Sequence, residues 1–127
     1  MILDTSAIVA ILNLEEDAVL YAQAIEQAPQ VSISSATVLE ATLVLGRSRI
    51  GTLREFLAEA SASVIPVDEE HLAVAQEGWL RFGRGSGSQA RLNYGDCFPY
   101  AAACIAGEPL LFKGNDFTHT DLASALS

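Results

Sequence analysis

Four acidic side chains in this sequence fall beside apolar segments rather than within charged ones. Asp4 directly follows three apolar residues, and Glu40 has apolar neighbours on both sides in "ATVLEATLVL". Asp96 precedes an apolar helical stretch, and Asp116 follows the apolar segment 110–112 after a three-residue turn. Carboxylates that meet in a buried or half-buried cluster repel one another unless protons or cations neutralise them. If the fold brings these four carboxylates together, a bound cation is expected to neutralise their charge.

Hard divalent ions are the cations that such a cluster suits. Mg²⁺ and Mn²⁺ prefer oxygen ligands, and they usually retain waters and substrate phosphate in their coordination shells. One or two such ions can activate water and stabilise the charge that develops on a leaving oxygen. The four acids are therefore candidates for metal-assisted hydrolysis of phosphodiester bonds.

Each acid also has a local explanation that needs no ligand. Asp4 and Asp96 can stabilise helix N-termini, and Pro99 would then lie in the first turn of the second of these helices. Glu40 can complete a capping box with Thr37, three residues earlier. The last of the four acids can be an ordinary turn residue. The spacing alone leaves these alternatives open.

The elements that would position these acids alternate between short apolar runs and longer helical patterns. Unbroken apolar runs are typical of strands buried on both faces of a parallel sheet. We therefore predict an α/β fold for residues 1–127 as a single domain, with a central parallel sheet flanked by helices on both sides. The predicted strands are 1–3, 31–33, 64–67 and 110–112, and the predicted helices are 6–13, 16–27, 36–46, 53–60, 69–82 and 97–106.

Capping residues and glycines support these boundaries. The Gly- and Ser-rich segment 83–95 predicts a mobile loop before the last helix. The predicted N-caps are Thr5 or Ser6 for the first helix, Ser34 or Ser35 for the third and Asp68 for the fifth, and the predicted stops are Gly46 and Gly107.

Composition limits the classes of function. The chain has 127 residues, 50% of them hydrophobic, which is enough for a sizeable core. A net charge of −9 argues against a protein that coats nucleic acid through a general basic surface. No apolar run approaches the length that spans a bilayer, so we expect a cytoplasmic protein without a membrane association. Cys97 and Cys104 are expected to be small core residues rather than a disulfide.

Four stretches together resemble a known family. "MILDTSAIVAIL", "ATVLEATLVL", "LNYGDCFPYAAA" and "GEPLLFKGNDFTHTDL" are similar to the motifs of PIN-domain ribonucleases, specifically the VapC toxins of bacterial toxin–antitoxin modules. The resemblance covers essentially the whole chain. It implies an Mg²⁺-dependent endoribonuclease, with Mn²⁺ as a possible substitute, that is neutralised by a VapB-type antitoxin and forms a homodimer.

The resemblance also assigns roles to residues. It makes Asp4, Glu40 and Asp96 the acidic triad, with Asp4 and Asp96 as direct metal ligands. Family members often carry an acid at the position of Gly114, so Asp116 is expected to substitute for it. The expected contacts to the carboxylates, waters or RNA are Thr5, Ser6, Asn115, Arg84 and Arg91.

The aromatic and apolar surface residues are assigned to protein contacts. We expect Trp79 and Phe82, at helical spacing, to be core or dimer contacts rather than platforms for bases. A groove for an antitoxin helix is a further hypothesis, although such residues are often ordinary core. Its candidate residues are Leu12, Leu14, Val19, Leu20, Leu39, Leu43 and Leu45.

Two other classes of function remain open from the residues alone. A receiver-like phosphoacceptor signalling domain would use Asp68 as the acceptor, Asp4 as an Mg²⁺ ligand and Lys113 as the partner lysine. That alternative leaves Glu40 and Asp96 without a purpose. The other alternative is a catalytically silent binding module that retains the fold.

Overall fold

The computed structural model describes residues 1–126 and contains four short strands and six α-helices within them. The strands are β1 (Ile2–Leu3), β2 (Ser32–Ser34), β3 (Ser63–Ile65) and β4 (Leu110–Leu111). The helices are α1 (Thr5–Leu12), α2 (Ala18–Gln27), α3 (Ser35–Leu45), α4 (Ile50–Glu59), α5 (Glu69–Phe82) and α6 (Tyr94–Ala106), and a 3₁₀ turn, η1 (Arg47–Arg49), precedes α4.

All four strands are parallel and lie in the order β3-β2-β1-β4. Ile2 is paired with Ser32 of β2 on one side and with Leu110 of β4 on the other. From β1 the chain adds β2 and β3 on one side, whereas β4 lies on the other side of β1. The order in which strands are added therefore reverses between β1 and β4. Ligands of open parallel sheets bind at such a point, outside the carboxyl ends of the strands.

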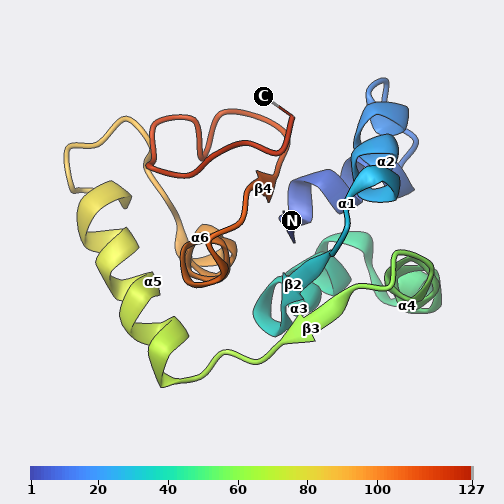
Figure 1. Ribbon diagram of the computed structural model, residues 1–127, viewed down its shortest axis with the longest axis horizontal. Coiled ribbons are helices and arrows are strands. Elements are labelled where there is room, and N and C mark those ends of the chain that lie inside the picture. The colour runs from blue at the N-terminus through green and yellow to red at the C-terminus, as the bar shows by residue number, and fades with distance from the viewer. Residues whose placement is uncertain (127) are drawn as a thin grey trace.

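Helices cover both faces of the sheet, as the sequence predicted. Successive strand residues point to opposite faces. Leu3 and Leu111 pack into a core with helices α1 to α4, whereas Ile2 and Leu110 pack with α6 and Phe117. Figure 1 shows the two layers, with α1 to α4 on one side of the strands and α5 and α6 on the other. The α/β prediction is therefore confirmed.

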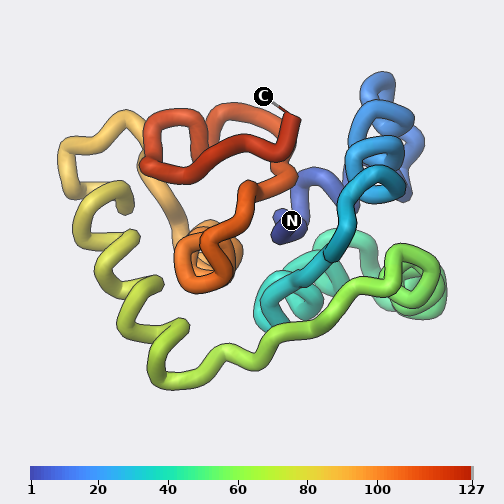
Figure 2. Tube along the Cα trace, viewed as in Figure 1, coloured from blue at the N-terminus to red at the C-terminus, as the bar shows by residue number. Residues whose placement is uncertain are grey.

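The C-terminal segment closes the β4 edge of the sheet. The backbone N–H of Leu110 donates to the carbonyl of Ala123 at 3.0 Å, and that of Ala125 donates to the carbonyl of Leu110 at 2.9 Å. Figure 2 shows residues 112–126 looping back beside β4. These bonds satisfy an otherwise open strand edge.

Helix starts differ from the prediction at several places: α2 begins two residues later than predicted, at Ala18, and α4 begins three residues earlier, at Ile50. Asp4, not Thr5 or Ser6, is the N-cap of α1, because its side chain accepts a hydrogen bond from the N–H of Ser6. Helix α6 begins three residues before the predicted start, so Pro99 lies inside the helix rather than in its first turn. Its missing N–H leaves the carbonyl four residues earlier without the usual helical donor.

The other predicted caps lie at helix ends. Ser34 occupies the N-cap position of α3 without a side-chain capping bond, whereas Asp68 accepts from the N–H of His71 at the start of α5. Gly46 and Gly107 follow α3 and α6 with positive φ angles of 93° and 65°.

The two cysteines differ in their exposure to solvent. Cys97 is buried but Cys104 is exposed, so only the first matches the expected core position, and both are free thiols.

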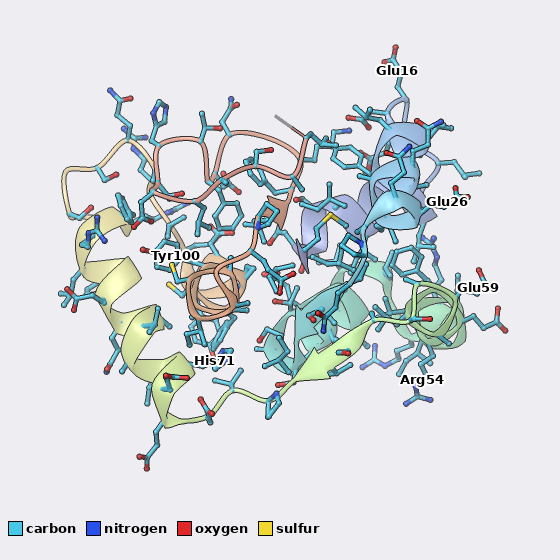
Figure 3. The ribbon with its side chains drawn as sticks, viewed as in Figure 1. Glu16, Glu26, Arg54, Glu59, His71 and Tyr100 are labelled. Atoms are coloured by element: carbon cyan, nitrogen blue, oxygen red, sulfur yellow. The ribbon has the colours of Figure 1, made fainter. Side chains whose placement is uncertain are left out.

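Figure 3 shows Glu26, Arg54 and Glu59 on the outer side of the α1 to α4 layer. Within residues 1–126, no helix is both long and apolar enough to cross a membrane.

Candidate active site

Asp4 lies where β1 ends and α1 begins. Its side chain is 6% exposed, and its Oδ2 accepts hydrogen bonds from the backbone N–H of Ser6 at 3.1 Å and from the Ser6 hydroxyl at 2.5 Å. Burial raises the pKa of Asp4 to about 6, and the charge of Glu40 adds to this rise, while the bonds from Ser6 oppose it. The carboxylate is thus held rigidly in a place that disfavours its charge.

Asp96 is held at the start of α6 by a capping box. The Asn93 side chain accepts from the N–H of Asp96 at 3.0 Å, and Oδ2 of Asp96 accepts from the N–H of Asn93 at 3.1 Å. The Asp96 side chain is 9% exposed, and burial raises its pKa to about 6. The charges of Asp116, Asp4 and Glu40 also raise it. The helix-capping explanation for Asp96 is therefore correct but does not explain this concentration of charge.

Glu40 and Asp116 complete the group. Glu40 comes from the second turn of α3, and its Oε1 accepts a hydrogen bond from the Thr5 hydroxyl at 2.5 Å. Asp116 is exposed in the turn that follows β4. Glu40 therefore bonds to α1 across the site and not to Thr37, whose buried hydroxyl has no hydrogen-bond partner within the described residues.

All four acids line one cleft of about 360 Å³ at the carboxyl edge of the sheet. They come from segments that are distant in sequence, and the parallel topology brings them together because the strand ends share this edge. The fold therefore brings the four acids together at one place. The remaining lining residues in the described part of the chain are Thr5, Ser6, Val9, Glu15, Val44, Asn93 and Lys113.

The predicted substrate contacts divide into two groups. Thr5 and Ser6 line the cleft, where their hydroxyls donate to Glu40 and Asp4. Asn115, Arg84 and Arg91 are exposed and do not line this cleft. Arg84 follows Gly83 and Arg91 precedes Leu92, and these two neighbours form a parallel bridge at the base of the loop before α6.

Three further polar or charged residues line the cleft, of which sequence reasoning considered only Lys113, as a phosphate contact. Asn93 could have been found from the "NYGD" pattern, an N-cap followed three residues later by an acid. Glu15 and Lys113 form an ion pair of 2.6 Å, and Lys113 also pairs with Asp17 at 3.0 Å. Lys113 is the only basic side chain among the described residues that line the cleft. Its pairing depends on tertiary contact, so no sequence pattern marks it.

The residues of the cleft fit a hard divalent cation. Their donors are oxygens, and mutual repulsion between carboxylates is relieved by a positive ion. Within residues 1–126, no group of three acidic, histidine or cysteine side chains converges closely enough to form a metal site by itself. Mg²⁺ needs no such cage, because it commonly binds through one or two carboxylates and keeps several waters.

The receiver-like alternative does not fit this geometry. Asp68 caps α5 and does not line the carboxylate cleft, and Lys113 is paired with Glu15 and Asp17. The acids that the alternative left unused, Glu40 and Asp96, are the ones that share the cleft with Asp4.

Comparison with known proteins gives a consistent assignment. The PIN domain family model matches residues 1–122. Ribonuclease VapC28 of Mycobacterium tuberculosis is 47% identical over 130 aligned residues, which cover 99% of this chain and 98% of that protein.

Solved structures show the same fold. The crystal structure of Mycobacterium tuberculosis VapC20, described as a Sarcin-Ricin loop cleaving toxin, superposes with a TM-score of 0.77 at 18% identity, covering 96% of this chain and 95% of that one. A toxin-antitoxin complex from Klebsiella pneumoniae gives a TM-score of 0.72 at 18% identity, covering 94% and 92%. With its acids gathered in one cleft and its near full-length similarity to VapC ribonucleases, this chain belongs to the VapC ribonucleases of the PIN-domain family.

Proposed function

We propose that this VapC ribonuclease is the toxin of a type II toxin–antitoxin module and cleaves RNA phosphodiester bonds with Mg²⁺ in the acidic cleft. The observation that carries the proposal is the convergence of Asp4, Glu40, Asp96 and Asp116 on one cleft, where burial disfavours the charged forms of Asp4 and Asp96. We further propose that residues 1–127 act as a single domain.

In this proposal the two buried acids hold the metal. Asp4 and Asp96 are the direct ligands, because both are fixed by hydrogen bonds from neighbouring backbone N–H groups. Bound Mg²⁺ would polarise the scissile phosphate and lower the pKa of a coordinated water. Glu40, restrained by Thr5, orients the attacking water. Asp116 is an outer acid that adds negative charge without a fixed partner. Mn²⁺, which shares the preference for oxygen ligands, is expected to substitute.

RNA contact is assigned to exposed side chains outside the cleft and to two hydroxyls within it. Arg84 and Arg91 lie at the base of the loop before α6, where guanidinium groups can bind phosphates bidentately. Asn115 is exposed in the turn that also carries Asp116. Thr5 and Ser6 act within the cleft by fixing the carboxylates.

A VapB-type antitoxin is the proposed protein partner. Large apolar side chains are exposed on α3 and on the segment from α1 to α2, with Leu14 85%, Leu43 73% and Val19 67% exposed. Leu45, by contrast, is buried and belongs to the core. Exposed apolar patches commonly mark protein interfaces. Leu43→Asp is therefore expected to abolish neutralisation by the antitoxin while RNA cleavage persists. A cytoplasmic location follows from this proposed function.

A homodimer is proposed through the face between α5 and α6. An apolar cleft of about 330 Å³ opens there, and Trp79 and Tyr94 on its walls are 49% and 82% exposed. Phe82, half-buried, instead packs on Tyr100, which Figure 3 shows between the two helices. Trp79→Glu should convert a dimer to a monomer in analytical ultracentrifugation.

The central experiment compares RNA cleavage by the wild type with that by Asp4→Asn and Asp96→Asn. Both variants should lose cleavage and growth inhibition, whereas Glu55→Gln, an exposed acid on α4, should retain both. Titration of Mg²⁺ and Mn²⁺ into the metal-depleted protein should restore wild-type activity. Full activity in both cleft variants would rule the proposal out.

A further inference from the structure

Glu40 is packed against the first turn of α6 at Gly95. A Cβ atom built on Gly95 would lie 1.9 Å from Oε2 of Glu40 and 2.8 Å from its Cδ. Both separations are under 3.0 Å, which real Cβ atoms essentially never show towards other heavy atoms. Any side chain at position 95 would therefore displace the Glu40 carboxylate.

The opposite side of the same carboxylate is held by α1. Oε1 of Glu40 accepts a hydrogen bond from the Thr5 hydroxyl at 2.5 Å. Thr5 directly follows Asp4, and Gly95 directly precedes Asp96. The Glu40 carboxylate thus lies between the two chain segments that carry the proposed metal ligands.

Backbone conformation does not explain the glycine. Gly95 is the second residue of α6 and is not among the glycines with positive φ, so an alanine could adopt its backbone angles. Gly78 also lacks room for a side chain, but its obstacle is the ring of Tyr100, which belongs to the core. At Gly95 the obstacle is the end of a flexible acidic side chain. The constraint therefore concerns the position of that carboxylate rather than the fold.

We propose that Gly95 is a positioning residue for the metal site: its missing side chain provides the space that sets Glu40 beside Asp4 and Asp96. This inference rests on the proposed metal-dependent function. It assigns no contact between Gly95 and the metal or RNA. Partners of metal-site residues typically change metal affinity by about 10- to 100-fold when they are altered.

Gly95→Ala tests this proposal, because it should separate folding from metal binding. The melting temperature should stay at or above that of the wild type, since alanine is the better helix former and the displaced atoms are the end of a long side chain rather than backbone or core. Mn²⁺ affinity, measured by electron paramagnetic resonance without RNA, should fall about tenfold. Gly51→Ala is the matched control, because a Cβ at that helical position meets no atom within 4 Å.

A double-mutant cycle identifies the mechanism. Glu40→Asp shortens the side chain by one methylene and withdraws the carboxylate from position 95. Adding Gly95→Ala in that background should therefore change Mn²⁺ affinity less than about twofold, since the steric conflict is already relieved.

Two outcomes would overturn the inference alone. Wild-type Mn²⁺ affinity in Gly95→Ala would show that the space is unnecessary, and an equal loss in both backgrounds would show that Glu40 is not the group displaced. Two other outcomes would remove the proposed function itself: a wild type that binds no Mn²⁺, or RNA cleavage that persists in Asp4→Asn and Asp96→Asn. The first two outcomes leave the proposed function intact, so the two failures are distinguishable.

Discussion

Ser6 connects Asp4 to the end of strand β4. Its hydroxyl donates to Oδ2 of Asp4 at 2.5 Å and accepts from the backbone N–H of Lys113 at 2.9 Å. The Ser6 side chain therefore orients Asp4 and also satisfies a backbone donor in the turn between β4 and Asp116. The position of Asp4 therefore depends on both β1 and β4, the neighbouring strands between which the strand order reverses.

The first prediction concerns the loss of that hydroxyl. Ser6→Ala should reduce the free energy of unfolding by about 1–3 kcal/mol, because the N–H of Lys113 loses its acceptor in a partly buried place. Since the bonds from Ser6 lower the pKa of Asp4, that pKa should rise, and the acidic limb of the cleavage profile should move to higher pH. Denaturant unfolding and a pH–rate profile test both effects. Ser6→Thr, which keeps a hydroxyl, should retain most of the wild-type behaviour, and an unshifted profile in Ser6→Ala would contradict the assignment.

The acids of the cleft could be found from the sequence because residues that directly follow different strands of a parallel sheet lie at the same edge. Asp4 follows an apolar strand, and Asp116 follows another, so a shared sheet edge predicts that they meet. Asp96 was placed correctly near a helix start, although the Asn93 cap moved that start three residues earlier. Local patterns were sufficient where one strand end or helix start decides the position of a side chain.

Other features depend on tertiary approach and leave no local signal. Arg84 and Arg91 are in a loop of the predicted composition, yet they are not among the residues that line the cleft. The pairing of Lys113 with Glu15 joins segments nearly a hundred residues apart. The contact of Gly95 with Glu40 likewise arises only when α3 packs beside α6.

The second prediction concerns stability and pH in metal-free protein. Asp96 has its pKa raised from 3.8 to about 6 in the folded state, so folding favours its protonated form. The associated destabilisation is absent below about pH 4, develops as the pH rises to 6 and is complete above it. At about 1.4 kcal/mol for each unit of pKa shift, the full shift corresponds to ~3 kcal/mol, and screening by solvent reduces the destabilisation below that value.

Asp96→Asn should therefore unfold at higher denaturant concentration than the wild type at pH 7.5 in EDTA. Its amide oxygen can still accept from the N–H of Asn93. At pH 4 the difference should disappear, because the wild-type carboxyl is then protonated. If the variant is less stable than the wild type at both pH values, the charge of Asp96 does not destabilise the folded state.

The third prediction concerns stabilisation by the metal. An ion that binds only the folded chain stabilises it by about 2.7 kcal/mol at a hundredfold excess over its dissociation constant. Mg²⁺ should therefore raise the melting temperature of the wild type in scanning calorimetry. The rise should vanish in Asp4→Asn, which loses a proposed ligand, and persist in Glu55→Gln. A similar rise in all three proteins would point to a general ionic effect instead.

The fourth prediction concerns Lys113, the single basic side chain among the described residues that line the cleft. Its ammonium group is paired with Glu15 and Asp17, which hold it at the rim but also offset its charge. If it contacts an RNA phosphate, Lys113→Met should weaken binding of a mixed-sequence oligoribonucleotide and reduce the slope of log affinity against log salt by about 0.7. Glu15→Gln should have the opposite effect on affinity, because it leaves the lysine less neutralised. Both are best measured by fluorescence anisotropy in the Asp96→Asn background, where the RNA is expected to stay intact. Equal affinities and salt slopes in all variants would assign Lys113 to the fold alone, as the link between β4 and the segment that joins α1 to α2.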